Sequence, residues 1–153
     1  MSAAHANLRL WTVRPARTSD LRPARVLLTA CGLPIDGIDD QFGENYAVAE
    51  AGADMHGIAG VEVHGAHGLL RSVAVEPSQQ GKGIAASLLA NRIEWSRQRG
   101  LDSIYLLTAT AERYFARHGF VAVARDSAPA AIRQSREFVE TCPATAVVMR
   151  KAL

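Results

Sequence analysis

The stretch VAVEPSQQGKGIA, residues 73–85, decides the fold of this chain. It begins with an apolar segment typical of a buried β-strand, continues through a polar turn, and reaches two glycines, Gly81 and Gly83, where a helical pattern begins. The first N–H groups of a helix have no partner within it and lie at the positive end of its dipole. Glycine lets a ligand approach the backbone closely, and Lys82 adds a positive charge. The stretch therefore predicts a strand, turn and helix that bind a pyrophosphate.

Two other phosphate-binding motifs fit this stretch poorly. A P-loop needs a glycine five residues before its lysine and a serine or threonine after it, but those positions hold Pro77 and Gly83. A dinucleotide fingerprint is matched superficially by Gly81-x-Gly83-x-x-Ala86. That fingerprint also needs an acidic residue at the end of the next strand, and residues 107–109 supply none. An ordinary β–α loop without a ligand remains the alternative.

Outward from this stretch, the hydrophobic pattern predicts an α+β chain built on a mixed sheet. The nearly continuous apolar run over 69–75 is typical of a central strand buried on both faces. The first helix is expected to bury Leu21, Val26, Leu27 and Leu28. Strands are predicted over 10–14, 46–50, 57–63, 69–75, 103–107, 120–124 and 144–150, and helices over 19–30, 83–100, 110–118 and 128–140.

Composition limits the class of protein. Hydrophobic residues make up 48% and charged residues 21% of the 153 residues, which is near the average for soluble globular proteins and argues against disorder. No apolar run approaches the roughly 20 residues that span a bilayer, and the N-terminus lacks the pattern of a secretory signal. We therefore expect one cytoplasmic domain over 1–153, frayed over 1–7, without a membrane partner.

Charge and cysteine content exclude further classes. A formal charge of +2 is too small to indicate a nucleic-acid-binding protein, and a phosphorylated small molecule is the more economical partner. Two cysteines, Cys31 and Cys142, are too few for a disulfide framework or a four-cysteine zinc site, and we expect them to be buried and inert. His56, His64 and His67 are close in sequence, but His64 and His67 flank a predicted turn, so we expect exposure there and not a metal site.

Two motifs together resemble a known family. Gln80-x-x-Gly83-x-Ala85, directly after a Val-Ala-Val-x-Pro strand, resembles the acetyl-CoA signature of the GNAT acyltransferase superfamily. The segment YFARHGF, residues 114–120, resembles the aromatic-x-x-x-Gly-Phe element of the same superfamily. The resemblance covers about residues 12 to 151. It implies a three-layer α/β/α fold with a mixed, mostly antiparallel sheet, and acetyl-CoA as the cosubstrate of an N-acetyltransferase.

The resemblance also implies where acetyl-CoA binds. The strand before the turn would splay from its neighbour, and its backbone at Val73 and Val75 would pair with the pantetheine arm. A backbone N–H near Val73 would polarise the thioester carbonyl as negative charge develops on its oxygen. The turn that wraps the pyrophosphate would consist of Gln80, Gly81, Lys82, Gly83, Ile84 and Ala85.

The sequence departs from the family pattern at two positions. Many members place a tyrosine that acts as a general acid where this chain has Phe115, and the tyrosine here is one residue earlier, at Tyr114. Adjacent helix positions lie about 100° apart, so Tyr114 is either a displaced catalytic acid or a core aromatic residue. Phe115 is expected to pack near the thiol. Thr108 takes the place of a frequent asparagine beside the cofactor.

Three polar residues on predicted strands are candidates for chemistry with the substrate. Glu62 is a candidate general base, and a solvated strand position is its alternative. Arg71 interrupts an apolar strand, where an unpaired charge is costly, so it would grip a substrate oxyanion or form an internal salt bridge. Ser72 beside it would orient the substrate or satisfy backbone groups.

The last third of the chain resembles one branch of the superfamily. Residues 126–133, Glu137-Phe138 and 142–146 are similar to a bacterial branch of arsenic-resistance acetyltransferases and relatives of amino-acid N-acetyltransferases. That branch implies an acceptor that is an amino-acid-like amine, such as an arsenical or a related α-amino acid. Arg133 would add to the grip on an acidic substrate, and a solvated helix face is its alternative.

Three functions are therefore compared. The first is acetylation of a small amino-acid-like amine, and the second is acetylation of a protein N-terminus or lysine. The third is a non-catalytic CoA-binding sensor, which Phe115 in the tyrosine position keeps open. Pairing of two copies through the final strand is compatible with the fold, and a metal is expected in none of these cases.

Overall fold

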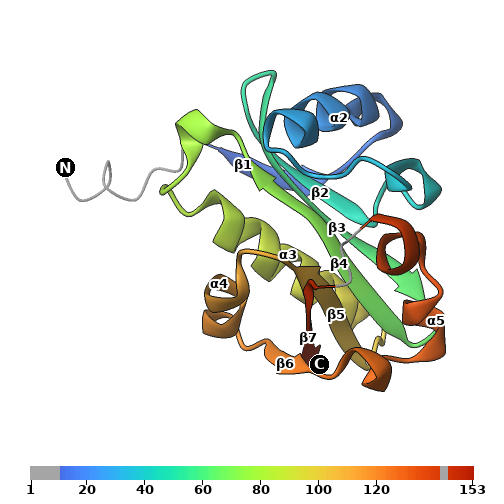
Figure 1. Cartoon of the computed structure of the whole chain (residues 1–153). Coiled ribbons are helices and arrows are strands. Elements are labelled where there is room, and N and C mark those ends of the chain that lie inside the picture. Colours follow the sequence, from blue (N-terminus) through green and yellow to red (C-terminus); the bar gives the residue numbers. More distant parts are fainter. Residues whose placement is uncertain (1–10, 142–144) are drawn as a thin grey trace.

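The computed structural model describes residues 11–141 and 145–153 and shows a sheet between two layers of helices (Figure 1). The predicted fraying of 1–7 and the predicted burial of Cys142 concern residues outside the described part of the chain. Among the residues described, no helix is long and apolar enough to cross a bilayer. The three-layer, mixed-sheet α+β architecture expected from the sequence is confirmed.

Seven strands form one twisted sheet. Their order is β1-β2-β3-β4-β5-β7-β6, in which only β4 and β5 pair in parallel and every other neighbouring pair is antiparallel. Strand β4 therefore lies at the centre, as its continuous apolar run predicts. The strands are β1 Thr12–Pro15, β2 Tyr46–Ala51, β3 Asp54–His64, β4 His67–Val75, β5 Ser103–Thr108, β6 Val121–Val123 and β7 Val147–Ala152.

Helices cover both faces of the sheet (Figure 1). Helices α3 and α4 pack on one face, and α2 and α5 pack on the other. The helices are α2 Leu21–Ala30, α3 Ile84–Gln98, α4 Glu112–Arg117 and α5 Ala130–Arg133. Single 3₁₀ turns occupy Thr18–Asp20, Ile38–Asp40, Pro77–Gln79 and Arg125–Ser127, and a π-helical turn occupies Glu137–Thr141.

The two faces have separate cores because neighbouring strand residues point to opposite sides of the sheet. Leu70 on β4 packs with Leu89 of α3, whereas Leu69 packs with Ile132 of α5. Burying a leucine or isoleucine completely stabilises the fold by about 1.5–3 kcal/mol. Both helical layers are thus fixed to the same central strand.

Two details of the helices differ from the sequence prediction. Val26 is 67% exposed, because the buried stripe of α2 runs through Ala24, Leu27 and Leu28 and Val26 falls beside it. The single helix predicted over 128–140 is interrupted after Arg133. There the Ser135 hydroxyl accepts a hydrogen bond from the Phe138 N–H at 3.3 Å and competes with regular helical bonding.

A glycine on β3 makes room for a fully buried tyrosine on β2. Gly60 lies opposite Tyr46 in the register of these strands. A Cβ atom at Gly60 would lie 2.2 Å from Cε2 of the Tyr46 ring, which is far inside van der Waals contact. The ring also stacks at 4.9 Å on Phe42, so it has no free direction in which to move.

We expect Gly60→Ala to lower the free energy of unfolding by about 3 kcal/mol, the upper end of the cost of overpacking a core. Gly32→Ala is the matched control, because a Cβ there meets nothing within 4 Å and only the left-handed φ of +70° is strained. That control should cost about 1 kcal/mol. Urea unfolding of both variants measures the difference. Equal losses of unfolding free energy in the two variants would show that the Tyr46 ring moves aside at no cost.

Candidate functional site

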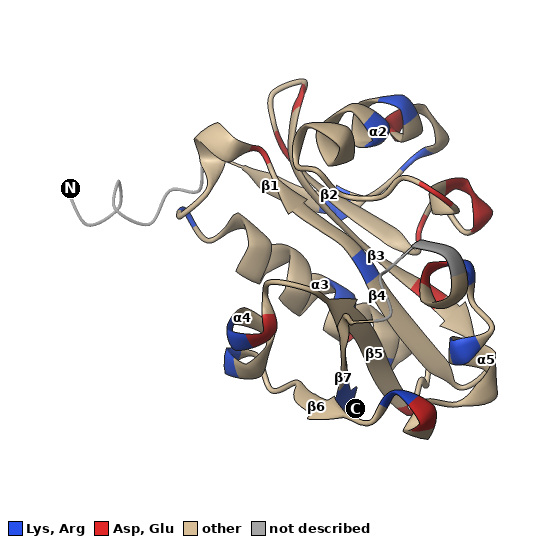
Figure 2. Ribbon diagram, viewed as in Figure 1, with Lys and Arg blue, Asp and Glu red and all other residues tan. Residues whose placement is uncertain are grey.

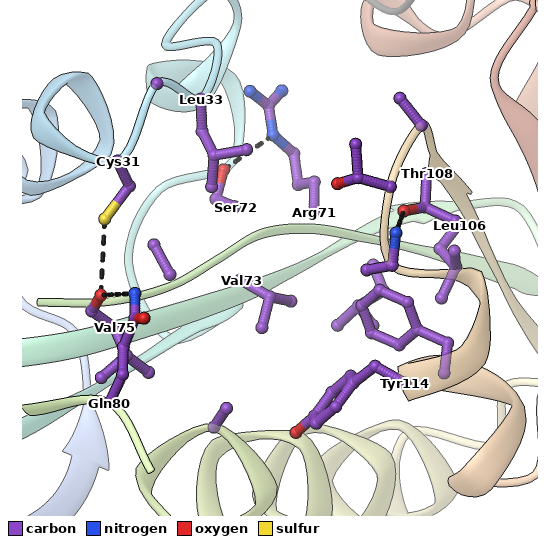
Figure 3. A pocket seen from close by; sticks show the side chains of 18 of the residues that line it. Cys31, Leu33, Arg71, Ser72, Val73, Val75, Gln80, Leu106, Thr108 and Tyr114 are labelled. Atoms are coloured by element: carbon purple, nitrogen blue, oxygen red, sulfur yellow. Dashed lines mark hydrogen bonds between the residues drawn. The ribbon is translucent and has the colours of Figure 1, made fainter. Parts of the chain in front are cut away.

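The site begins where two central strands stop pairing. β4 and β5 share only three paired rows, from His67 with Ser103 to Leu69 with Tyr105. Beyond these rows each strand continues alone, and a pocket of about 1000 Å³ lies between them (Figure 3). The pocket is lined by residues 31–34, 70–75, 79–81, 83–86 and 106–111, and by Tyr114, Phe115, Glu137 and Ala146. The splayed strands expected from the sequence are therefore present.

At one end of the pocket lies the N-terminus of α3. Gly81 and Gly83 both have left-handed backbone conformations, with φ of +81° and +92°. No side chain caps the helix, and its first backbone bond runs from the Ser87 N–H to the Gly83 carbonyl. The N–H groups of Ile84 and Ala85 precede that bond and are directed out of the helix end. An anion is the ligand that such an end favours.

Most of the predicted turn residues line this end of the pocket. Gln80, Gly81, Gly83, Ile84 and Ala85 do so. The exception is Lys82, whose exposed ammonium group donates a hydrogen bond to the side chain of Gln79 at 3.1 Å.

The Val75 carbonyl, at the end of β4, is already bonded. It accepts hydrogen bonds from Gln80 Nε2 at 3.2 Å and from Cys31 Sγ at 3.5 Å (Figure 3). A ligand that pairs with this carbonyl must displace one of the two donors. The Cys31 thiol has a raised pKa because it is partly buried, so it is a poor nucleophile.

The middle of the pocket wall is a β-bulge. Ala74 lies opposite Ile58 and Arg71 lies opposite Gly60, so Ser72 and Val73 share a single partner residue on β3. Ser72 has φ of +58°, and among the described residues it is the one non-glycine residue with a positive φ. Bulges turn the backbone away from regular pairing and occur beside active sites. Here the bulge lies at the level of Val73, where the family resemblance implies contact with the thioester.

Two aromatic side chains of α4 form the opposite wall. Phe115 is buried and packs on Phe120 in the core, while the Tyr114 ring stands almost perpendicular to it at 5.3 Å. The Tyr114 hydroxyl is buried and has no hydrogen-bond partner in the described part of the chain. Burial raises its pKa, so the hydroxyl stays protonated. In Figure 3 the ring lies below Val73 and its hydroxyl is directed toward α3.

Thr108 lines the pocket at the end of β5, but its hydroxyl is engaged elsewhere. The Thr108 Oγ1 accepts a hydrogen bond from the Ala111 N–H at 2.9 Å. That bond supports the start of α4, which carries both aromatic residues. Thr108 therefore fixes the position of the aromatic wall.

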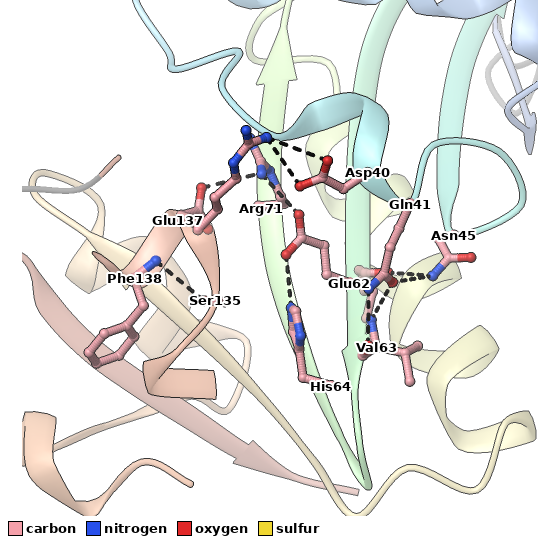
Figure 4. A network of polar contacts seen from close by, with 12 residues as sticks. Asp40, Gln41, Asn45, Glu62, Val63, His64, Arg71, Ser135, Glu137 and Phe138 are labelled. Atoms are coloured by element: carbon pink, nitrogen blue, oxygen red, sulfur yellow. Dashed lines mark hydrogen bonds and ion pairs between the residues drawn. The ribbon is translucent and has the colours of Figure 1, made fainter. Parts of the chain in front are cut away.

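The other end of the pocket contains a buried charged cluster around Arg71 (Figure 4). The guanidinium group has no exposed surface and pairs with Glu62 at 2.9 Å. Its other nitrogens donate to the Asp36 carbonyl at 2.8 Å and the Ser72 hydroxyl at 3.2 Å. Arg71 is the one lysine or arginine of β4. In Figure 2, most of the residues coloured for charge lie on the helices and turns around the sheet. The internal salt bridge that the sequence left open as an alternative is present.

Glu62 belongs to this cluster and not to the main pocket. One of its oxygens pairs with Arg71, and the other lies 2.9 Å from His64 Nε2. Although burial opposes ionisation, the bonds from His64 and Arg71 hold the pKa of Glu62 below its ordinary value. Glu62 lines a second, smaller pocket of about 540 Å³, together with His64 and Asp40.

Glu137 is a charged residue of the pocket to which sequence reasoning gave no role. The residue is 6% exposed, lines the main pocket, and lies 3.8 Å from Arg71 Nε. Burial raises the pKa of this carboxyl to about 7, against the opposing effect of Arg71. In a helical pattern a single glutamate is expected in solvent, and only the interruption after Arg133 directs it inward.

Other predicted residues lie away from the pocket or have local partners. Arg133 is exposed, lines neither pocket, and donates from Nε to the Ala128 carbonyl at 2.9 Å. The exposure expected for His64 and His67 is wrong, because both are half-buried and bonded, His64 to Glu62 and His67 to Ser103. No group of three potential metal ligands occurs within 11–141 and 145–153.

Comparison with known proteins identifies the family. The family model described as "Acetyltransferase (GNAT) domain" matches residues 42–122. Among curated protein sequences, none matches this chain.

Solved structures share the fold at low identity. N-acetylglutamate synthase from Neisseria gonorrhoeae, complexed with coenzyme A and L-arginine, is 19% identical with a TM-score of 0.79 over 95% of this chain. The chain spans only about a third of that protein, 34% of its length. Rv2747 from Mycobacterium tuberculosis, in complex with CoA, is 23% identical with a TM-score of 0.78, covering 93% of this chain and 99% of the other. The ribosomal-protein-S18-alanine N-acetyltransferase from Escherichia coli is 20% identical with a TM-score of 0.70, covering 93% of each chain.

We expect Glu137→Gln to stabilise the protein more at pH 8 than at pH 5. The pKa of this carboxyl is about 4.5 when the group is free and about 7 in the folded protein. Between these two pH values the folded protein therefore binds more protons than the unfolded chain. Stability is then lost as pH rises through this window, and glutamine removes that loss, on the order of 2 kcal/mol. Urea unfolding of variant and wild type at the two pH values measures the difference. The exposed Glu94, changed in the same way, should give a difference that does not vary with pH.

Proposed function

The chain belongs to the GNAT acetyltransferase family, and from that premise we propose that it transfers an acetyl group from acetyl-CoA directly to the amine of a small, amino-acid-like molecule. One observation carries the proposal. A single pocket of about 1000 Å³ extends from the open helix end of α3 to the buried cluster at Arg71 and Glu137. Cofactor and acceptor therefore share one cavity, as direct transfer requires.

We assign the cofactor to the end formed by the glycine turn. The pyrophosphate would lie against the backbone of Gln80–Ala85 at the N-terminus of α3, with Lys82 adding charge from the surface. The pantetheine arm would follow the unpaired edge of β4 and take backbone hydrogen bonds at Val73 and Val75. This places the thioester at the bulge, between Val73 and the aromatic wall of Tyr114 and Phe115.

The residues around the bulge suit an acyl transfer. As the amine attacks, negative charge develops on the thioester oxygen, and a backbone N–H near Val73 would stabilise it. The sulfur then leaves as a thiolate and needs a proton. A buried, protonated and unpartnered hydroxyl is the natural donor, and Tyr114 carries one.

A small acceptor fits the far end of the pocket. That end is walled by Leu33, Pro34 and Glu137, and its charged groups are buried. Two N-acetylglutamate synthase structures that share the fold were solved with L-arginine and with N-acetyl-glutamate, which supports an amino-acid-like acceptor. Arsenic- and phosphorus-containing amino-acid analogues belong to the same class. Arg71 and Ser72 would act here by holding the wall in place, since their polar groups are bonded to each other.

The test is release of free CoA from acetyl-CoA, followed with a thiol reagent over a panel of acceptors. The panel contains amino acids, arsenic- and phosphorus-containing analogues, polyamines and short peptides. We expect turnover with small amino-acid-like amines and little with peptides. Turnover confined to peptides would overturn the proposed acceptor class, and tight CoA binding without any turnover would indicate a sensor.

A pair of variants shows whether turnover depends on the glycine turn. Ala86 and Ala90 are both exposed on α3, one helical turn apart, but only Ala86 lines the pocket. Ala86→Glu places a negative charge beside the proposed pyrophosphate and should raise the KM for acetyl-CoA at least tenfold. Ala90→Glu should change it less than about twofold.

Tyr114→Phe should lower kcat by about tenfold to a hundredfold while leaving the KM for acetyl-CoA nearly unchanged, because only the proton donor is removed. Tyr105→Phe is the control, since Tyr105 is buried on the other face of the sheet beside His67. Steady-state kinetics at pH 7.5 gives both constants. If kcat of Tyr114→Phe equals that of wild type, water supplies the proton and Tyr114 is only part of the wall.

A further inference from the structure

The charged cluster at the end of the pocket contains two carboxylates and one guanidinium group. Glu137 is faced by Arg71 from β4, Glu62 from β3 and the Tyr46 hydroxyl from β2. Beyond Glu62 lies His64, which pairs with the outer carboxylate oxygen. When both carboxylates are ionised and His64 is neutral, the cluster carries one more negative than positive charge.

Arg71 is one cation shared by two buried carboxylates, so it cannot balance both of them. Glu62 lies 2.9 Å from the guanidinium group, whereas Glu137 lies 3.8 Å away, beyond hydrogen-bond distance. On the segment of Glu137 itself, Arg136 extends to Asp40 at 3.3 Å. Two buried carboxylates that share one cation leave a negative charge uncompensated, which is costly, and a cation supplied by a ligand would compensate it.

We propose that the acceptor enters this pocket as an ammonium cation that pairs with Glu137, and that Glu137 then takes one proton from it. The proposal rests on the proposed function and specifies the charge state of the acceptor. It makes Glu137 a catalytic residue and leaves Glu62 to hold Arg71. An acceptor carboxylate must then lie away from Glu137, because like charges repel in a buried site.

The proton balance of the step closes without any further reactant. The ammonium group gives one proton to the Glu137 carboxylate and becomes a neutral amine. Its lone pair forms the C–N bond to the thioester carbon and the C–S bond breaks. The Tyr114 hydroxyl gives its proton to the sulfur of CoA, and the second proton of the nitrogen restores that hydroxyl. After the amide leaves, Glu137 returns its proton to solvent. A carboxyl group whose pKa is near the pH of the surrounding solution can both take and return a proton.

Ethylamine is the probe, because it is a minimal primary amine that stays cationic over the pH range used. Its acetylation is measured at saturating acetyl-CoA from pH 5.5 to 9 for the wild type, Glu137→Gln, Glu137→Asp and Glu94→Gln. In the wild type, kcat/KM should fall on the acidic side of the pH profile, with the midpoint of this acidic limb near pH 7. Glu137→Gln should lose this limb and be at least tenfold slower at pH 7.5, with partial rescue by Glu137→Asp. Glu94→Gln should follow the wild type, since that side chain lies outside the pocket.

A second measurement needs no turnover. The melting temperature of the CoA complex is compared in ethylammonium chloride and in sodium chloride of equal concentration at pH 8. The wild type should be stabilised by the organic cation and Glu137→Gln should not. An unchanged pH profile in Glu137→Gln overturns the proposal while the proposed function stands. If no amine is acetylated, the proposed function fails, and the melting temperatures decide whether Glu137 binds a cation.

Discussion

The loss of pairing between β4 and β5 is the constraint on which the rest of the structure depends. Backbone N–H and C=O groups within a protein need hydrogen-bond partners, and an open edge in the middle of a sheet leaves a row of them unpaired. After Leu69 and Tyr105, no strand among the described residues fills the gap. A ligand with amide groups along its length can complete the sheet there. The glycine turn, the bulge at Ser72 and the aromatic wall are all placed along this gap.

The two ends of the gap differ in which groups carry the charge. At the α3 end, the charge is borne by backbone dipoles, which stay in place whatever the pH. At the other end it is borne by Arg71, Glu62 and Glu137, which are held away from water, so that their balance responds to a bound ion. In the reaction that we propose, an anionic cofactor and a cationic acceptor would be drawn to opposite ends of one pocket, and the reacting groups would meet at the bulge between them.

Local sequence predicted the parts of the site that depend on local rules. The sequence predicted the turn at Gly81 and Gly83, the continuous apolar strand over 69–75 and the class of sheet. These features depend on glycine conformation and apolar periodicity, which act over a few residues. Glu137 could not be found in this way. Its inward direction depends on the Ser135 hydroxyl breaking the helix and on packing against strands more than sixty residues earlier. Likewise, the sequence showed Arg71 as a charge in need of a partner but could not choose between Glu62 and a ligand.

The interrupted helix ties the acceptor end of the pocket to the core. Glu137 lines the pocket, whereas the next residue, Phe138, is buried among Leu69, Tyr105 and Val148 beneath the sheet. The backbone that carries the carboxyl group cannot move aside unless an aromatic ring leaves the interior, which would cost several kcal/mol. This wall of the pocket is therefore rigid and does not close over a ligand. We expect steric exclusion of an acceptor of the wrong shape, because the protein does not rearrange around it.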